Sequence, residues 1–169
     1  MSYQTEITKE DLLKIFDYDP VSGNLIKRKT GKPVTYPPFD KTAKVSFKIN
    51  NKPYRLPSHT LIWLMCYDVW PTGVVFHKDF NQFNLRITNL MEVTRVKNYA
   101  LLSAYKNLTE YCDIKPHSQD KHIYLVRYIS NNRLKYEQYH DIKFAQIACK
   151  RLKDNYRRLI IQLGAIPPK

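Results

Sequence analysis

The stretch VFHKDFNQFNLRITNLMEVTRVKN, residues 75–98, decides how the rest of the chain is interpreted. Its pattern predicts a strand over 74–77, a polar loop over 78–84, and then a second strand or an irregular segment over 86–93. Thr94 is a favourable N-cap for a helix that ends near Leu108, because its hydroxyl can accept a hydrogen bond from the first helical turn. The stretch therefore predicts a strand, loop, strand and helix in succession.

The sequence on either side predicts further helices and strands, from the helical and the alternating spacing of its apolar residues. Upstream, we expect a helix that begins at the capping box of Thr8 and Asp11 and stops before Tyr18, and then a strand over 25–29. Two strands over 43–49 and 52–56 should form a hairpin with its turn at Asn50-Asn51. An apolar helix should follow, from 57–59 to Trp70. Downstream, we expect strands over 122–129 and 133–140 with a turn at Asn131-Asn132, and a helix from Asp141 to Leu163 whose apolar stripe is Phe144, Ile147, Ala148, Leu152, Tyr156 and Leu159 or Ile160.

The charge balance is the strongest global signal. The chain has 28 Lys and Arg residues against 15 Asp and Glu, a net charge of +13 over 169 residues. Such a surplus favours a polyanionic partner, because binding releases the partner's counterions. The segment 97–169 is the shorter part and carries more of the surplus than 1–96.

Cysteine content and apolar runs bear on the compartment. The three cysteines, Cys66, Cys112 and Cys149, are far apart and odd in number, which fits neither a disulfide framework nor a zinc site. We expect buried free thiols and a reducing compartment. The longest apolar run, Leu61 to Cys66, is too short to span a membrane, and the first residues lack the pattern of a signal peptide.

Three polar residues of the opening stretch have the chemistry of phosphodiester hydrolysis, which needs a base, a divalent cation and a rigid support at one point. His77 would be the base, since an imidazole titrates near neutral pH. Asn89 would bond across the loop and hold the histidine. The carbonyl oxygen of Asn98, on the helix, suits a hard cation such as Mg²⁺.

The stretch resembles the HNH (ββα-metal) endonuclease motif of phage and intron homing endonucleases. That pattern is roughly DH-[IK]-DGN-x₂-NN-R-I-x-NL-x₂-VT-x₂-EN, and here it reads FH-K-DFN-QF-NL-R-I-T-NL-ME-VT-RV-KN. Upstream, FDYDPVSGNLIKRK and SHTLIWLMCYDVWP resemble further parts of the family. The resemblance implies His77 as the base, Asn89 as a loop support, Asn98 as a metal ligand, a divalent cation such as Mg²⁺, double-stranded DNA as the substrate, and the cytoplasm of an infected bacterium as the location.

The chain departs from the family at three positions of the motif. Phe76 stands where the family has an acidic metal ligand, Phe80 replaces the loop glycine, and Leu85 replaces the second asparagine of a pair. Asp79 is a candidate replacement ligand, because in an extended strand it would point to the same face as His77. In the family, the matching aspartate usually caps the loop.

The C-terminal part resembles the AP2-type DNA-binding module that is often appended to phage HNH proteins. In that module the sheet enters the major groove and the helix packs behind it, which implies base contacts from Arg127, Arg133 and Lys135. The basic face of the last helix is either a solvated surface or a contact for phosphates. Its candidate residues are Lys150, Arg151, Lys153, Arg157 and Arg158.

We therefore expect an α+β fold in two domains. The first is an HNH-like nuclease domain over 1–108 with its ββα core at about 74–106, followed by a linker over 109–119 and an AP2-like domain over 120–169. Two functions stay open. The protein is either a nuclease that cuts DNA with a divalent cation, or a catalytically inactive descendant that acts as a DNA-binding regulator or as an inhibitor of a host protein. Phe76 is the residue that separates them.

Overall fold

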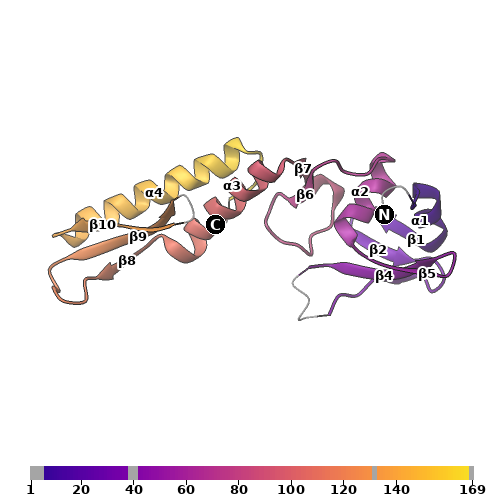
Figure 1. Ribbon diagram of the computed structural model, residues 1–169, viewed down its shortest axis with the longest axis horizontal. Helices are drawn as coiled ribbons and strands as arrows, with labels where there is room; N and C mark the ends of the chain where they lie inside the picture. Colours follow the sequence, from indigo (N-terminus) through magenta and orange to yellow (C-terminus); the bar gives the residue numbers. More distant parts are fainter. Residues whose placement is uncertain (1–5, 38–41, 131–132, 168–169) are drawn as a thin grey trace. The chain divides into compact units, whose positions relative to one another are not determined.

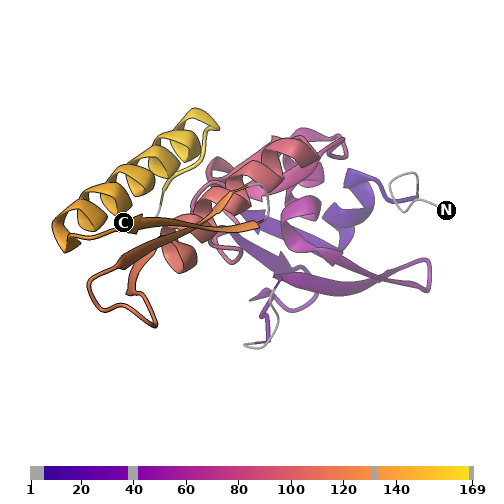
Figure 2. The same cartoon turned by 60° about the vertical axis from the view of Figure 1, so that its left-hand side comes forward.

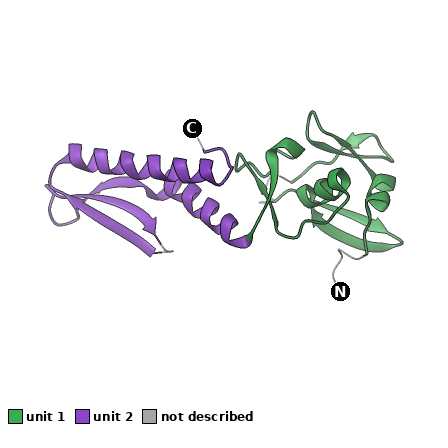
Figure 3. Cartoon of the chain, turned by 90° about the horizontal axis from the view of Figure 1, so that it is seen from above, with its two compact units in different colours: residues 1–94 green, residues 95–169 purple. Residues whose placement is uncertain are grey.

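The computed structural model describes residues 6–37, 42–130 and 133–167. Helices alternate with small antiparallel sheets, so the chain has the expected α+β fold (Figure 1). Contacts divide it into two compact units, residues 1–94 and 95–169 (Figure 3). The sequence suggests a linker at 109–119, but in the structure this segment holds the end of a helical stretch and a strand. Among the described residues, none of the helices has the length and apolar character to cross a membrane.

The described residues of unit 1 form two α-helices and three small sheets around an apolar core. The elements are α1 (Lys9–Ile15), β1 (Phe16–Asp19), β2 (Asn24–Lys27), β3 (Lys32–Pro33), β4 (Lys44–Ile49), β5 (Lys52–Pro57), α2 (Ser58–Tyr67), β6 (Val74–His77), a 3-10 turn (Ile87–Asn89) and β7 (Leu90–Val93). The sheets are β1-β2-β3, β4-β5 and β6-β7. Helix α2 lies at the centre of the core, where Leu61 and Ile62 are fully buried.

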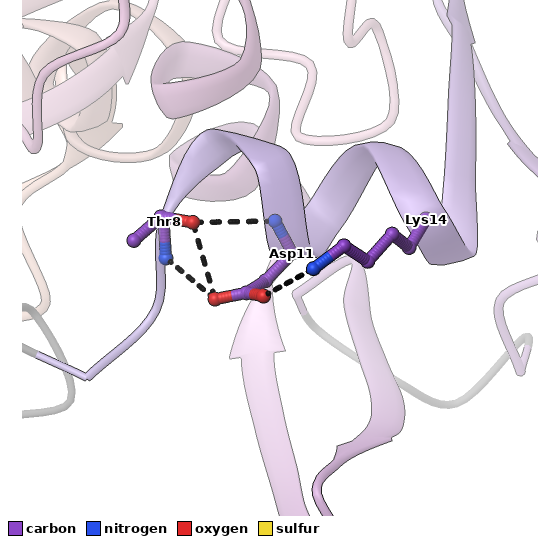
Figure 4. Close-up of polar contacts among 3 residues, drawn as sticks. All are labelled: Thr8, Asp11 and Lys14. Carbon is purple, nitrogen blue, oxygen red and sulfur yellow. Dashed lines mark hydrogen bonds and ion pairs between the residues drawn. The ribbon is translucent and has the colours of Figure 1, made fainter.

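Local signals set several boundaries in unit 1. The capping box at α1 is confirmed: the Thr8 hydroxyl accepts a bond from the Asp11 amide at 3.3 Å, and the Asp11 carboxylate accepts one from the Thr8 amide at 3.3 Å (Figure 4). The β4–β5 hairpin is also confirmed, with φ values of 49° and 62° at Asn50 and Asn51. These left-handed values are the ones a two-residue hairpin turn requires.

Helix α1 stops before Tyr18 as expected; it ends at Ile15, and Phe16 begins a strand. Two other expectations for unit 1 are wrong. Helix α2 ends at Tyr67 rather than Trp70, because Asp68 adopts a left-handed φ of 59° and stops it. Cys66 is exposed, whereas Cys112 and Cys149 are buried as free thiols.

Unit 2 is a three-stranded sheet covered on one face by a long helix. The elements are α3 (Arg95–Lys106), a π-helical turn (Asn107–Tyr111), β8 (Asp113–Pro116), β9 (Tyr124–Ser130), β10 (Arg133–Tyr139) and α4 (Ile142–Gln162). The sheet order is β10-β9-β8. Helix α4, orange to yellow in Figure 2, lies along this sheet. The core joins Val126 of β9 to Ala145, Ala148 and Cys149 of α4. The expected Asn131-Asn132 turn lies outside the described residues.

The apolar stripe predicted for α4 is partly wrong. Phe144 and Ile147 are each 63% exposed, whereas Ala145 and Ala148 are buried. The buried stripe is thus rotated toward the small side chains, which let α4 approach the sheet closely. Strand β8 was not expected, because its four residues DIKP carry little of the strand pattern.

Candidate functional site

His77 is the last residue of β6 and one of the few buried polar residues. The β6–β7 ladder pairs His77 with Leu90, and the chain between them forms the loop of the motif. The His77 side chain is 6% exposed, and burial lowers its pKa below the ordinary value for histidine. Its Nε2 atom is buried and has no hydrogen-bond partner among the described residues. A buried polar atom of this kind is costly unless something satisfies it.

Asn89 is the centre of the loop. Its Oδ1 accepts a bond from the Asp79 amide at 3.2 Å, and its Nδ2 donates to Asp79 Oδ1 and to the Asn84 carbonyl, each at 2.9 Å. Its carbonyl accepts the Lys78 amide at 2.8 Å. The side-chain bonds of Asn89 therefore go to Asp79 and Asn84 rather than to the His77 ring. Asn89 holds the histidine through the backbone, because its carbonyl bonds the amide of Lys78, the residue after His77.

Asp79 serves the same loop. Its Oδ1 accepts bonds from the Asn81 amide at 2.9 Å and from Asn89, and its Oδ2 accepts the Asn84 side-chain amide at 2.7 Å. The pKa of Asp79 is lowered even though burial opposes the shift, because these bonds favour the charged form. The carboxylate thus acts as the cap of the loop, and both of its oxygens are engaged there.

The segment FDYDPVSG supports the loop from outside the motif. The Tyr18 hydroxyl donates to the Leu85 carbonyl at 3.0 Å and accepts the Ile87 amide at 2.8 Å. Arg86 Nε donates to the Val21 carbonyl at 2.7 Å. Gly23 has a φ of +80°, and a Cβ atom there would lie 2.7 Å from the Arg86 amide nitrogen. The sequence resemblance pointed to this segment but gave no contact for these residues.

Phe76 and Phe80 contact each other beside the histidine. Phe76 is 6% exposed, and its ring meets that of Phe80 edge to face, with centroids 5.1 Å apart. Phe80 has a φ of +61°, a conformation that glycine adopts without strain. The two aromatic residues that replace the family's acid and glycine therefore occupy one apolar contact.

His59, at the start of α2, lies against the other side of the site. Its ring is edge-on to that of His77, with 4.9 Å between centroids. Burial, and to a smaller degree the neighbouring His77, lower the pKa of His59 to about 4. Both imidazoles are therefore neutral at pH 7, and His77 is in the form that can accept a proton. From the sequence, two interpretations of His59 stayed open: by the family resemblance, a residue near the DNA backbone or packed under the site, or simply a polar residue at the start of the helix.

The side chains of unit 1 do not fit a divalent cation at this point. The position before His77 carries a phenyl ring, which cannot coordinate a metal, and the Asp79 oxygens are bonded to loop amides. No cluster of three His, Cys, Asp or Glu residues occurs in the part of the chain that the structure describes. Asn98, the other predicted ligand, belongs to α3 of unit 2, where it is half-buried.

The predicted DNA contacts of the sheet in unit 2 lie on both of its faces. Arg127 pairs across the ladder with Tyr136 and forms a two-bond ion pair with Asp113. Lys135 pairs with Tyr128, two residues from Val126, so Lys135 shares the face that packs against α4. Arg133 shares the Lys135 face by the same alternation. Arg127 is therefore the one of these three on the face away from α4.

The basic residues of α4 differ in their partners. Arg151 forms an ion pair with Glu137, and Arg157 with Asp154, each at 3.3 Å. Lys150, Lys153 and Arg158 form no ion pair within the described residues, and Lys150 and Arg158 are exposed. Exposed ion pairs are weak and exchange readily for other partners. All five residues thus remain able to meet a polyanion.

Comparison with known proteins finds one similarity, which covers the site. A family model described as HNH endonuclease matches residues 57–100, which run from the end of β5 into α3. Searches of curated proteins and of solved structures found no match to the chain. The matched segment contains His59, His77, Asp79, Asn89 and Asn98. The segment that carries the candidate site is thus similar to the HNH endonuclease family.

Proposed function

We propose that the protein binds double-stranded DNA with an HNH-type scaffold and does not assemble the metal centre that would cut it. The observation that carries this proposal is the burial of Phe76 against Phe80, at the position of the family's acidic ligand. The net charge of +13 supports a DNA partner, because a basic protein gains free energy from counterion release.

In this proposal, the loop of residues 78–89 is a rigid support rather than a reaction centre. Asn89 and Asp79 fix the shape of the loop through their hydrogen bonds. His77, the last residue of β6, holds the start of the loop to the strand. The phosphate contacts come from unit 2, with Lys150, Arg151, Lys153, Arg157 and Arg158 on α4. On the sheet, Arg127 is the further candidate in keeping with an AP2-like module, because it lies on the face away from α4, whereas Arg133 and Lys135 share the face that packs against the helix.

A second function, hydrolysis of the DNA backbone, is favoured by one observation. The Nε2 atom of His77 is buried without a partner among the described residues, and burial keeps the ring neutral. An unsatisfied imidazole nitrogen is suited to take a proton from a water molecule. Asp79 and Asn98 are the candidate ligands that the sequence pattern suggests for a cation such as Mg²⁺.

Two measurements test the proposal. The first is fluorescence anisotropy with a short duplex at rising salt concentration. The logarithm of the association constant should fall steeply and linearly with the logarithm of the salt concentration. Absence of binding at low salt would contradict it and favour a protein partner, such as a host protein that the chain inhibits.

Cleavage is tested on supercoiled plasmid with Mg²⁺ or Mn²⁺. The wild type should leave the plasmid intact. Cutting by the wild type that is lost in His77→Ala would establish the second function instead. Cutting gained in Phe76→Asp would show that the missing ligand alone separates this chain from an active nuclease.

A further inference from the structure

The outer face of the β4–β5 hairpin in unit 1 is basic. The ladder pairs Val45 with Leu56 on the buried face, and Ser46 with Arg55 on the other. Side chains alternate along a strand, so Lys44 and Lys48 share the outer face with Arg55. All three cations are exposed.

A hollow of about 250 Å³ lies on this face beside β2. Lys27, Lys44 and Arg55 line it, together with the hydroxyl-bearing Thr35 and Ser46. No acidic residue lines it among the described residues. We call it the basic hollow.

The ladder beside the basic hollow also brings like charges together. Lys27 of β2 pairs directly with Lys32 of β3, so the two ammonium groups share a face. Like charges directly opposite each other in a sheet are destabilising. An anion held between the lysines would offset this repulsion.

The donors of the basic hollow match the oxygens of a phosphodiester. Lysine supplies a point charge and arginine a planar fork, and both form strong charge-assisted hydrogen bonds to phosphate. The hydroxyls of Thr35 and Ser46 can donate to the same oxygens.

The extent of the charge favours a polymer over a small anion. A second hollow, of about 390 Å³, adjoins the first, shares Ser46 and Arg55 with it, and reaches Lys48. Residues four apart in a strand are separated by about 13 Å. Lys44 and Lys48 therefore spread the charge over a length that a run of backbone phosphates fills and a single phosphate ion does not.

We propose that the basic hollow binds backbone phosphates of the DNA, as a contact in unit 1 separate from those of unit 2. This inference rests on the proposed DNA binding and adds a second surface to it. The contact reads no sequence, since phosphates are alike along the duplex; it would fix the position of unit 1 on the DNA.

The test compares two double variants by anisotropy with a nonspecific duplex. Lys27→Gln with Lys44→Gln removes two charges from the basic hollow, and Lys9→Gln with Lys14→Gln removes two charges from α1. Circular dichroism verifies that both variants fold. The first variant should bind about threefold to tenfold more weakly, and its salt slope should fall by about 1 to 2. The second should keep the wild-type slope.

Lysine acetylation of the wild type, read by mass spectrometry, locates the contact without any substitution. DNA should protect Lys27 and Lys44 and leave Lys9 and Lys14 reactive. If DNA binds and protects lysines of unit 2 but not these two, with equal slopes in both variants, the inference is wrong and the proposed function stands. If DNA does not bind at all, both fail. Protection of Lys27 by inorganic phosphate but not by DNA would also overturn the inference.

Discussion

The rings of Phe76 and Phe80 meet at 90°, with 5.1 Å between their centroids. The HNH pattern has an acid at the first of these positions and a glycine at the second. Phe80 keeps the left-handed backbone that the glycine would adopt, with a φ of +61°. The two departures from the family pattern are therefore coupled, because the ring of Phe80 packs against the ring of Phe76, which replaces the acid. This contact offsets the backbone strain of about 1 kcal/mol at Phe80.

Phe76→Asp should lower the free energy of unfolding by about 2–4 kcal/mol, because it places a carboxylate in an apolar contact. Phe80→Gly should cost less, since relief of the strain offsets part of the lost contact. The double variant should show a coupling of roughly 0.5–1.5 kcal/mol. Urea unfolding followed by circular dichroism measures all three values. Effects that add within about 0.5 kcal/mol would show that the rings do not support each other.

Asn89→Ala should destabilise unit 1 by about 2–4 kcal/mol, because it removes three hydrogen bonds and leaves loop groups unsatisfied. Asn89→Asp should be worse near neutral pH, since an oxygen would then face Asp79 Oδ1 in place of the Nδ2 that lies 2.9 Å from it. That penalty should shrink when acidification protonates one of the carboxyls. Asn24→Ala, at an exposed position, is the control. Equal unfolding midpoints for the Ala and Asp variants at neutral pH would contradict this arrangement.

The parts of unit 1 that the sequence predicted correctly rest on local signals. The capping box at Thr8 and the Asn50-Asn51 turn each involve side chains or φ values within a few residues. Strand β6 over 74–77 was likewise readable from its apolar run. The resemblance of the site depended on residue types and their spacing, which suggest His77 and Asn89 as site residues but do not say which atoms are in contact.

What the sequence did not predict depends on contacts between distant segments. Strand β8 exists because its backbone pairs with β9, whatever its side chains. The buried face of α4 is set by how closely the helix approaches the sheet, so small residues are buried and Phe144 stays exposed. The Tyr18 bonds to the loop join residues 67 and 69 positions apart. No pattern within one element encodes such contacts.

Gly23→Ala should destabilise unit 1 by more than Gly31→Ala. Both glycines have positive φ, +80° and +66°, so an alanine is strained by about 1 kcal/mol at either position. At Gly23, the added Cβ would also lie 2.7 Å from the Arg86 amide nitrogen, whereas at Gly31 nothing lies within 4 Å. We expect a difference of at least about 1 kcal/mol in the free energy of unfolding, since backbone must move at Gly23. Equal losses in the two variants would show that FDYDPVSG does not support the loop.

His59 should make stability depend on pH. Burial and the neighbouring His77 lower its pKa to about 4, from about 6.5 in the unfolded chain. Between these values the unfolded state binds more protons than the folded state, so stability is fully present above pH 6.5 and falls as the pH drops toward 4. The loss amounts to on the order of 3 kcal/mol at the lower end.

His59→Gln should therefore flatten the pH dependence of the unfolding midpoint relative to the wild type, most visibly between pH 5 and 6.5, where few carboxylates titrate. The control is His140→Gln, at an exposed position of unit 2. His77 has a pKa lowered in the same direction, so the flattening is partial rather than complete. If the wild type and His59→Gln lose stability in parallel over this range, the two imidazoles are not buried against each other as the 4.9 Å contact requires.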